Sequence, residues 1–138
     1  MKKGPIILIE DDKDDQELMQ DILHQVHISN ELICFTNGRE ALQYLKTTSD
    51  QPFLILSDVN MPLMNGLELG ALINEDQELK NKSIPFIFLT TTASTSAVKQ
   101  AYNMSVQGFF EKGANIKEIG KMIRLIYDYW QLCRHPNS

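Results

Sequence analysis

Cysteine is scarce in this chain, and no apolar run approaches the length of a transmembrane span. The two cysteines, Cys34 and Cys133, form neither a CxxC pair nor a metal-ligand spacing with the histidines. A reducing, cytoplasmic compartment is the simplest interpretation, with Cys34 buried in a strand. The first apolar run stops after Ile9 and no cleavage-like segment follows, so we expect neither a signal peptide nor a membrane segment.

An excess of positive charge is also missing, because the 138 residues carry a formal net charge of -5. Binding to a nucleic-acid backbone relies on a positive face, so direct nucleic-acid binding is not expected. Internal repeats, low-complexity segments and linkers are absent as well. The chain therefore predicts one domain over residues 4–131, followed by a short tail over residues 132–138.

Apolar runs alternate with helical patterns along the whole chain, which is typical of βαβ units around a parallel sheet. We expect strands at about residues 5–10, 31–36, 53–58, 84–90 and 107–111. Helices are expected between them and after the last strand. The polar segment 75–83 predicts a helix end and an exposed connection.

The last expected helix begins near Asn115 and has one apolar face. That face is made by Ile116, Ile119, Ile123 and Ile126. Its aromatic end has more apolar surface than one core stripe requires, and consists of Tyr127, Tyr129 and Trp130. Two interpretations stay open: the end packs against the domain, or it forms a surface for a second copy or a partner.

Polar side chains suited to a phosphoryl group follow four of the apolar runs. Glu10 and Asp11 follow the first run, Asp58 the third, Thr90 the fourth and Lys112 the fifth. The carboxyl ends of strands in an open parallel sheet form the crevice in which ligands bind. Each residue alone has an ordinary structural alternative, as a helix cap, a strand end or a solvated lysine. Their joint occurrence at successive strand ends predicts a metal-dependent phosphoryl site.

The chemistry of these side chains fits that prediction. Magnesium is held by one or two carboxylates together with carbonyls, waters and phosphate oxygens. Clustered carboxylates repel by roughly 4 kcal/mol per close pair at an effective dielectric near 20, so Lys112 and a divalent cation are expected to offset their charge. A carboxylate such as Asp58 can act as a nucleophile and form an aspartyl phosphate. Thr90 and Lys112 can bind phosphoryl oxygens.

The order of these residues resembles the receiver domain of two-component response regulators, of the stand-alone type. Residues 58–66 also match that family's loop, Asp-x-x-Met-Pro-x-x-x-Gly, and the resemblance covers about residues 5–130. It implies a flavodoxin-like (βα)5 fold, an α/β doubly wound parallel sheet of strand order 2-1-3-4-5.

The resemblance also implies residue roles. Asp58 would be the phosphoacceptor, taking the phosphoryl group from a phosphohistidine on a sensor histidine kinase or a histidine phosphotransfer protein. Asp11, Asp58 and the backbone carbonyl of Asn60 would coordinate Mg2+ or Mn2+, with Glu10 helping through water.

The remaining implied roles concern the phosphoryl oxygens and the switch. Thr90 and Lys112 would hold the oxygens, and Phe109 stands where the family carries its switch aromatic. Several positions depart from the family pattern, among them Phe109, which lacks a tyrosine hydroxyl. Gly113 replaces the proline that often follows the lysine, and Thr91 is bulkier than the residue usual after the switch threonine.

Signalling would pass through an interaction surface. In the family this surface is made by the helix after the fourth strand, the fifth strand and the last helix, and here it includes Tyr102, Phe109 and Tyr129. The expected partners are a downstream protein target and, as an open alternative, a second copy of the chain.

Two other functions are alternatives to this one. A phosphatase with an aspartyl nucleophile commonly needs a second aspartate two residues later, where this chain has Asn60. We therefore expect no enzyme, but a phosphoacceptor domain that assists its own phosphorylation and dephosphorylation. A constitutive protein-binding module with a silent site is the alternative, and the complete set of Asp11, Asp58, Thr90 and Lys112 argues against it.

Overall fold

A computed structural model describes residues 4–59, 64–90, 95–103, 107–111 and 115–133. Within these ranges, parallel strands form one sheet in the order β2-β1-β3-β4-β5, which confirms the predicted flavodoxin-like topology. The strands are β1 (Ile6–Ile9), β2 (Leu32–Phe35), β3 (Leu54–Ser57), β4 (Phe86–Thr90) and β5 (Gly108–Glu111).

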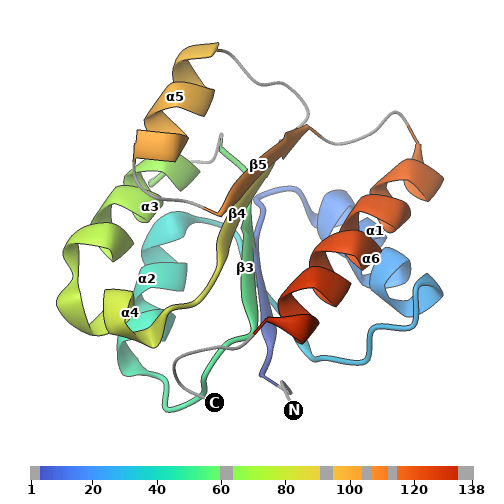
Figure 1. Cartoon of the computed structure of the whole chain (residues 1–138), viewed down its shortest axis with the longest axis horizontal. Helices are drawn as coiled ribbons and strands as arrows, with labels where there is room; N and C mark the ends of the chain where they lie inside the picture. Colours follow the sequence, from blue (N-terminus) through green and yellow to red (C-terminus); the bar gives the residue numbers. More distant parts are fainter. Residues whose placement is uncertain (1–3, 60–63, 91–94, 104–106, 112–114, 134–138) are drawn as a thin grey trace.

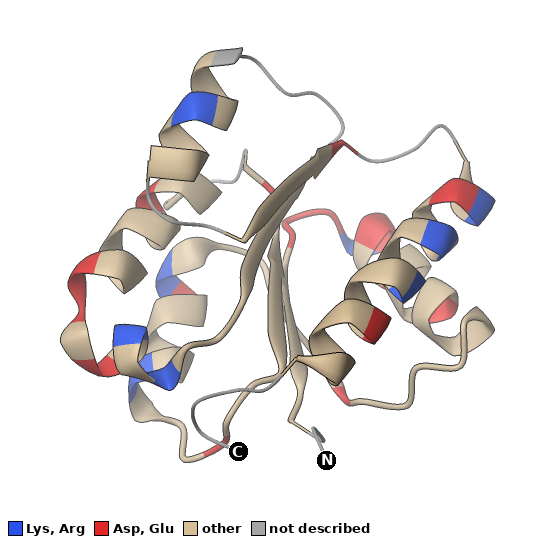
Figure 2. Cartoon of the chain, viewed as in Figure 1, with Lys and Arg blue, Asp and Glu red and all other residues tan. Residues whose placement is uncertain are grey.

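Helices cover both faces of the sheet, as Figure 1 shows. They are α1 (Lys13–Gln25), α2 (Gly38–Thr47), α3 (Gly66–Glu75), α4 (Gln77–Lys82), α5 (Thr95–Asn103) and α6 (Ile116–Leu132). Helices α1 and α6 lie side by side on one face, whereas α2, α3, α4 and α5 lie on the other. Charged residues lie on the helices, on the loops and at the end of β5, and the strand interiors are uncharged (Figure 2).

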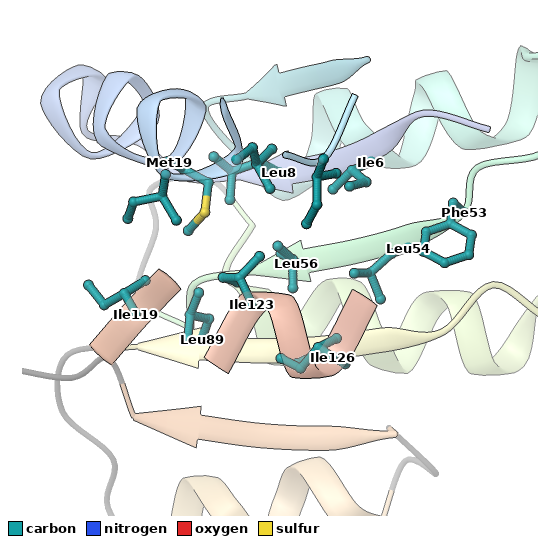
Figure 3. Packing of buried hydrophobic residues seen from close by; sticks show 14 residues of the cluster. Ile6, Leu8, Met19, Phe53, Leu54, Leu56, Leu89, Ile119, Ile123 and Ile126 are labelled. Atoms are coloured by element: carbon teal, nitrogen blue, oxygen red, sulfur yellow. The ribbon is translucent and has the colours of Figure 1, made fainter. Parts of the chain in front are cut away.

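Alternation along each strand divides the buried side chains into two cores, because successive side chains point to opposite faces. We call the first the α1–α6 core, part of which is drawn in Figure 3; it contains Ile6, Leu8, Met19, Ile22, Leu23, Ile28, Phe53, Leu54, Leu56, Ile87, Leu89, Ile119, Ile123 and Ile126. We call the second the α2–α5 core; it contains Ile7, Ile9, Ala41, Leu45, Ile55, Val59, Leu69, Leu79, Phe86, Phe88 and Ala101. Each fully buried aliphatic side chain contributes about 2 kcal/mol.

Side-chain caps fix where the helices near the carboxyl edge of the sheet begin. Asp12 accepts hydrogen bonds from the backbone N–H groups of Asp14 and Asp15 at 2.8 and 3.3 Å. Asn65 and Glu68 form a capping box, with reciprocal bonds of 2.8 and 3.0 Å. These bonds satisfy N–H groups that the first turn leaves without helical partners. The chain therefore enters α1 and α3 at defined points beside the strand ends.

The structure corrects two predictions of burial. Cys34 is exposed, because β2 is an edge strand and the helix layer leaves this side chain uncovered. Ile116 is 46% exposed, because the first turn of α6 precedes the stretch that packs into the core.

One helix was not predicted. Within segment 75–83 the structure has the separate helix α4, which begins after its cap Asp76. Only Leu79 of this helix is buried, so its sequence shows too little apolar periodicity to mark a helix.

Candidate functional site

Acidic side chains from two neighbouring strands gather at the carboxyl edge of the sheet. Ile9 of β1 lies opposite Ser57 of β3, so the residues that follow the two strands come together. One carboxylate oxygen from each of Glu10, Asp11 and Asp58 lies within 4.8 Å of the others. Figure 2 shows the acidic loop between β1 and α1 at this edge.

Glu10 is the most buried member of this group, at 3% exposure. Its backbone N–H donates to the carbonyl of Phe35 at 2.9 Å, which continues the pairing of β1 with β2. Its Oε2 accepts from the Asp12 N–H at 3.3 Å, and its carbonyl accepts from Nε2 of Gln16 at 2.6 Å. A buried carboxylate is costly unless positive charge compensates it, and here two further carboxylates lie beside it. This arrangement calls for a cation.

Asp58 is half-buried and is held by three backbone-linked hydrogen bonds. Its N–H donates to the carbonyl of Ile9 at 3.0 Å. Its Oδ1 accepts from the N–H of Val59 at 2.7 Å, and its carbonyl accepts from Oγ of Ser57 at 2.8 Å. The carboxylate therefore has a defined orientation, because one of its oxygens already accepts a hydrogen bond.

Gly66 closes the loop that begins at Asp58. Its N–H donates to the carbonyl of Val59 at 2.9 Å. A Cβ atom at this position would lie 2.2 Å from the carbonyl oxygen of Asp58 and 2.8 Å from a ring carbon of Phe88. Only glycine allows so close an approach, which explains the glycine at the end of this loop.

Thr90 and Phe109 lie on the next two strands. Thr90 ends β4 and is 1% exposed. Phe109 on β5 is half-buried and pairs in register with Phe88, and the two ring centroids are 5.5 Å apart. The Phe109 ring therefore packs next to the residue that contacts the Asp58 loop.

The other predicted site residues, Asn60 and Lys112, lie outside the described residues, as do Thr91 and Gly113. Their roles stay predictions. No role is assigned to Ser57 from the sequence, which places it within the expected strand over residues 53–58. The signal in the sequence was a hydroxyl-bearing residue at the end of an otherwise apolar run, which indicates a side chain with a hydrogen-bonding role.

The described carboxylates fit a hard divalent cation. Mg2+ and Mn2+ favour oxygen ligands, and a set of carboxylate oxygens within 4.8 Å of one another can be shared by one ion. Such an ion would offset the negative charge of the buried Glu10 carboxylate and of its neighbours Asp11 and Asp58. The donor chemistry thus supports the predicted metal and not a soft, thiolate-bound one.

Comparison with known proteins gives a family match over most of the chain. Residues 6–124 match the family described as the response regulator receiver domain. Response regulator Rcp1 of Synechocystis sp. is 35% identical over 130 residues, which cover 91% of this chain and 87% of that protein.

Solved structures agree with this match. The phosphorylated cyanobacterial phytochrome response regulator RcpA is 29% identical, with a TM-score of 0.85 over 97% of this chain and 98% of that chain. The Mn(2+)-bound form of Rcp1 is 33% identical, with a TM-score of 0.81 over 96% and 97% of the two chains. Within the described ranges, no helix is both long and apolar enough to span a membrane.

Proposed function

Because this chain belongs to the response regulator receiver domain family, we propose that Asp58 is the carboxylate that accepts the phosphoryl group. Receivers of this family signal in a phosphorylation-dependent way and bind Mg2+ or Mn2+. The single observation that carries the assignment is the convergence of Asp58 with Glu10 and Asp11 at the carboxyl edge of the sheet. Of the three, Asp58 has its carboxylate oriented by the next backbone N–H.

The proposed reaction is an in-line transfer from a phosphohistidine. One carboxylate oxygen of Asp58 attacks phosphorus, so that an O–P bond forms and the P–N bond breaks. The electron pair of that bond remains on the imidazole nitrogen, which takes up a proton. Glu10, Asp11, Asp58 and the carbonyl of Asn60 would hold the metal, which when bound offsets negative charge on the carboxylates and the phosphoryl oxygens.

Thr90 and Lys112 are proposed to bind the phosphoryl oxygens, and Phe109 to follow the movement of Thr90. Support comes from Thr90, which is buried at the end of the strand beside β3. Phe109 lies one strand further on and packs against Phe88. Charge at Asp58 would thereby bias a packing change on the outer strands.

The proposed phosphodonor is a sensor histidine kinase or a histidine phosphotransfer protein, and the proposed site of action is the cytoplasm. RcpA is titled a phytochrome response regulator, so a light-regulated kinase is a rational first donor to test. The output is proposed to be a protein target or a second copy of the chain. Large exposed side chains on α5 and α6 support this surface, among them Tyr102 at 54% and Tyr129 at 63% exposure.

Intact-mass measurement after incubation with Mg2+ and acetyl phosphate tests the assignment. Wild type is expected to gain one phosphoryl group, and Asp58→Asn none. Asp50→Asn is the matched control, since it removes an exposed carboxylate outside the cluster and should leave the adduct unchanged. An adduct on Asp58→Asn equal to that of wild type would show that another residue accepts the phosphoryl group. No adduct on wild type, repeated with phosphorylated kinases, would favour a silent binding module.

We further propose that the chain has no general phosphatase activity. The position two residues after Asp58 is Asn60, which cannot serve as a general acid. Incubation with p-nitrophenyl phosphate should release no nitrophenol above the Asp58→Asn background. Sustained turnover that Asp58→Asn abolishes would restore the enzyme hypothesis.

A further inference from the structure

Ser57 is a buried hydroxyl in an otherwise apolar strand. It ends β3 with 0% exposure, between Ile9 of β1 and Phe88 of β4 in the sheet register. A hydroxyl removed from water must find a hydrogen-bond partner inside the protein. The partner of Ser57 is the carbonyl oxygen of Asp58, at 2.8 Å.

The peptide group between Asp58 and Val59 links this hydroxyl to the site. Its carbonyl oxygen accepts from Ser57, and its N–H donates to Oδ1 of Asp58 at 2.7 Å. The peptide group is conjugated, so a hydrogen bond to its oxygen polarises its N–H. The Ser57 hydroxyl therefore strengthens the bond that orients the Asp58 carboxylate, although it does not touch that carboxylate.

We propose that Ser57 is a positioning residue for phosphoryl transfer, acting through the 58–59 peptide group on the Asp58 carboxylate. The inference rests on the proposed role of Asp58 as phosphoacceptor. With Oδ1 held by Val59, the second carboxylate oxygen has a restricted set of directions from which to attack phosphorus. Restriction of the nucleophile to a reactive geometry accelerates transfer.

If Ser57 acts only through its small size, Ser57→Ala should leave the phosphorylation rate unchanged. Gly66 packs so closely that a Cβ built on it would lie 3.0 Å from the Ser57 oxygen, so this position needs a small side chain. Alanine is equally small but has no hydroxyl. Cysteine is somewhat larger than serine and is a weak donor. The series serine, cysteine, alanine therefore weakens the hydrogen bond while keeping a small residue.

The test combines a spectroscopic and a kinetic measurement on the full chain. In metal-free, unphosphorylated protein, the amide proton of Val59 should shift upfield in Ser57→Ala, with Ser57→Cys in between. With saturating Mg2+ and acetyl phosphate, the phosphorylation rate should fall about five-fold in Ser57→Ala, the effect expected for loss of one net hydrogen bond, and less in Ser57→Cys. Mg2+ affinity should change little, whereas the thermal midpoint should fall by several degrees, as expected for loss of one buried hydrogen bond.

Thr47→Ala is the control, because it also removes a hydroxyl bonded to a backbone carbonyl, that of Gln43 at 2.9 Å, but on the surface of α2. It should leave the Val59 shift and the rate unchanged. An unchanged rate in Ser57→Ala overturns the inference, even if stability falls. A slower rate with an unmoved Val59 amide overturns it too, since the effect would then not pass through the peptide group. If wild type takes up no phosphoryl group, the proposed function fails and the inference with it, and the Val59 shift still shows whether the hydrogen bonds are coupled.

Discussion

The two faces of the sheet differ in how they connect to the acidic edge. The α1–α6 core consists of aliphatic side chains, a methionine and one phenylalanine beneath two helices of 13 and 17 residues. The α2–α5 core contains Phe88, which lies beside the Asp58 loop and packs against Phe109. We therefore expect substitutions in the α1–α6 core to change stability alone. Substitutions around Phe88 in the α2–α5 core should change both stability and the geometry of the Asp58 loop.

We expect aromatic contacts on β4 and β5 to carry this coupling. The rings of Phe86 and Phe88 pack edge to face with centroids 5.0 Å apart, and Phe88 and Phe109 lie 5.5 Å apart. Gly66 fits between the carbonyl of Asp58 and the Phe88 ring. Close-packed rings cannot move independently, so a shift in the Asp58 loop is expected to reach Phe109.

The largest effect on stability is expected in the middle of the α1–α6 core. Ile123→Ala empties a position that is 2% exposed in the α1–α6 core and should lower the free energy of unfolding by about 3 kcal/mol. Urea titration measures this loss. The phosphorylation rate per folded molecule should stay within two-fold of wild type. A large loss of rate in fully folded protein would contradict the proposed difference between the two faces.

On the other face, adding one methyl group should lower both the stability and the phosphorylation rate. Gly66→Ala forces a Cβ against the Asp58 carbonyl and the Phe88 ring, which should cost about 2 kcal/mol of stability. Displacement of the Asp58 backbone should also slow phosphorylation by acetyl phosphate more than ten-fold. Normal stability together with a normal rate would show that the loop yields without disturbing Asp58.

Adjacent phenylalanines on β5 give a matched pair. Phe109→Leu loses the ring contact with Phe88, and should cost about 1 kcal/mol. It should also reduce the amide shift changes that phosphorylation produces in α5, which lies on the same face as Phe109. Phe110→Leu alters the α1–α6 side and should leave those changes intact. Equal responses from the two variants would mean that the signal does not follow one face.

The smallest effect is expected at a second glycine, on α6. A Cβ at Gly120 would lie 3.4 Å from Cγ1 of Val26 and 3.8 Å from Cγ2 of Ile22, which are ordinary contacts. Gly120→Ala should therefore stabilise the protein by about 0.5–1 kcal/mol, because alanine favours a helix interior. Thermal melts detect the gain, and phosphorylation should be unchanged. A loss of stability would show that the α1–α6 interface is tighter than these distances indicate.

A parallel sheet and the convergence of the carboxylates were open to prediction from the sequence pattern, whereas the strand order 2-1-3-4-5 was implied by the family resemblance. Alternating apolar runs and helices leave few topologies for a parallel sheet, and residues that follow neighbouring strands must then meet at one edge. The role of the Asn60 carbonyl as a metal ligand came from family resemblance alone, whereas Lys112 was also indicated by its place after a strand and its positive charge.

Other features depend on neighbours that no local pattern records. Cys34 resembles a core residue until β2 is found at the edge of the sheet. A serine at the end of β3 is compatible with a capping, solvated or buried hydroxyl, and only the position of the 58–59 peptide group distinguishes them. Local composition does not encode such contacts.

The membership of the α1–α6 core also has a consequence for how the chain folds. Ile6 and Leu8 of the first strand share this core with Ile119 and Ile123 of α6, from the opposite end of the described sequence. During synthesis, β1 and β3 can pair long before α6 emerges from the ribosome, yet the part of this face that α6 covers, beside α1, stays open to water until it does. Contacts between distant parts of a chain form slowly, and exposed apolar surface attracts chaperones and other nascent chains. We therefore expect closure of this face to be the late, aggregation-sensitive step of biogenesis.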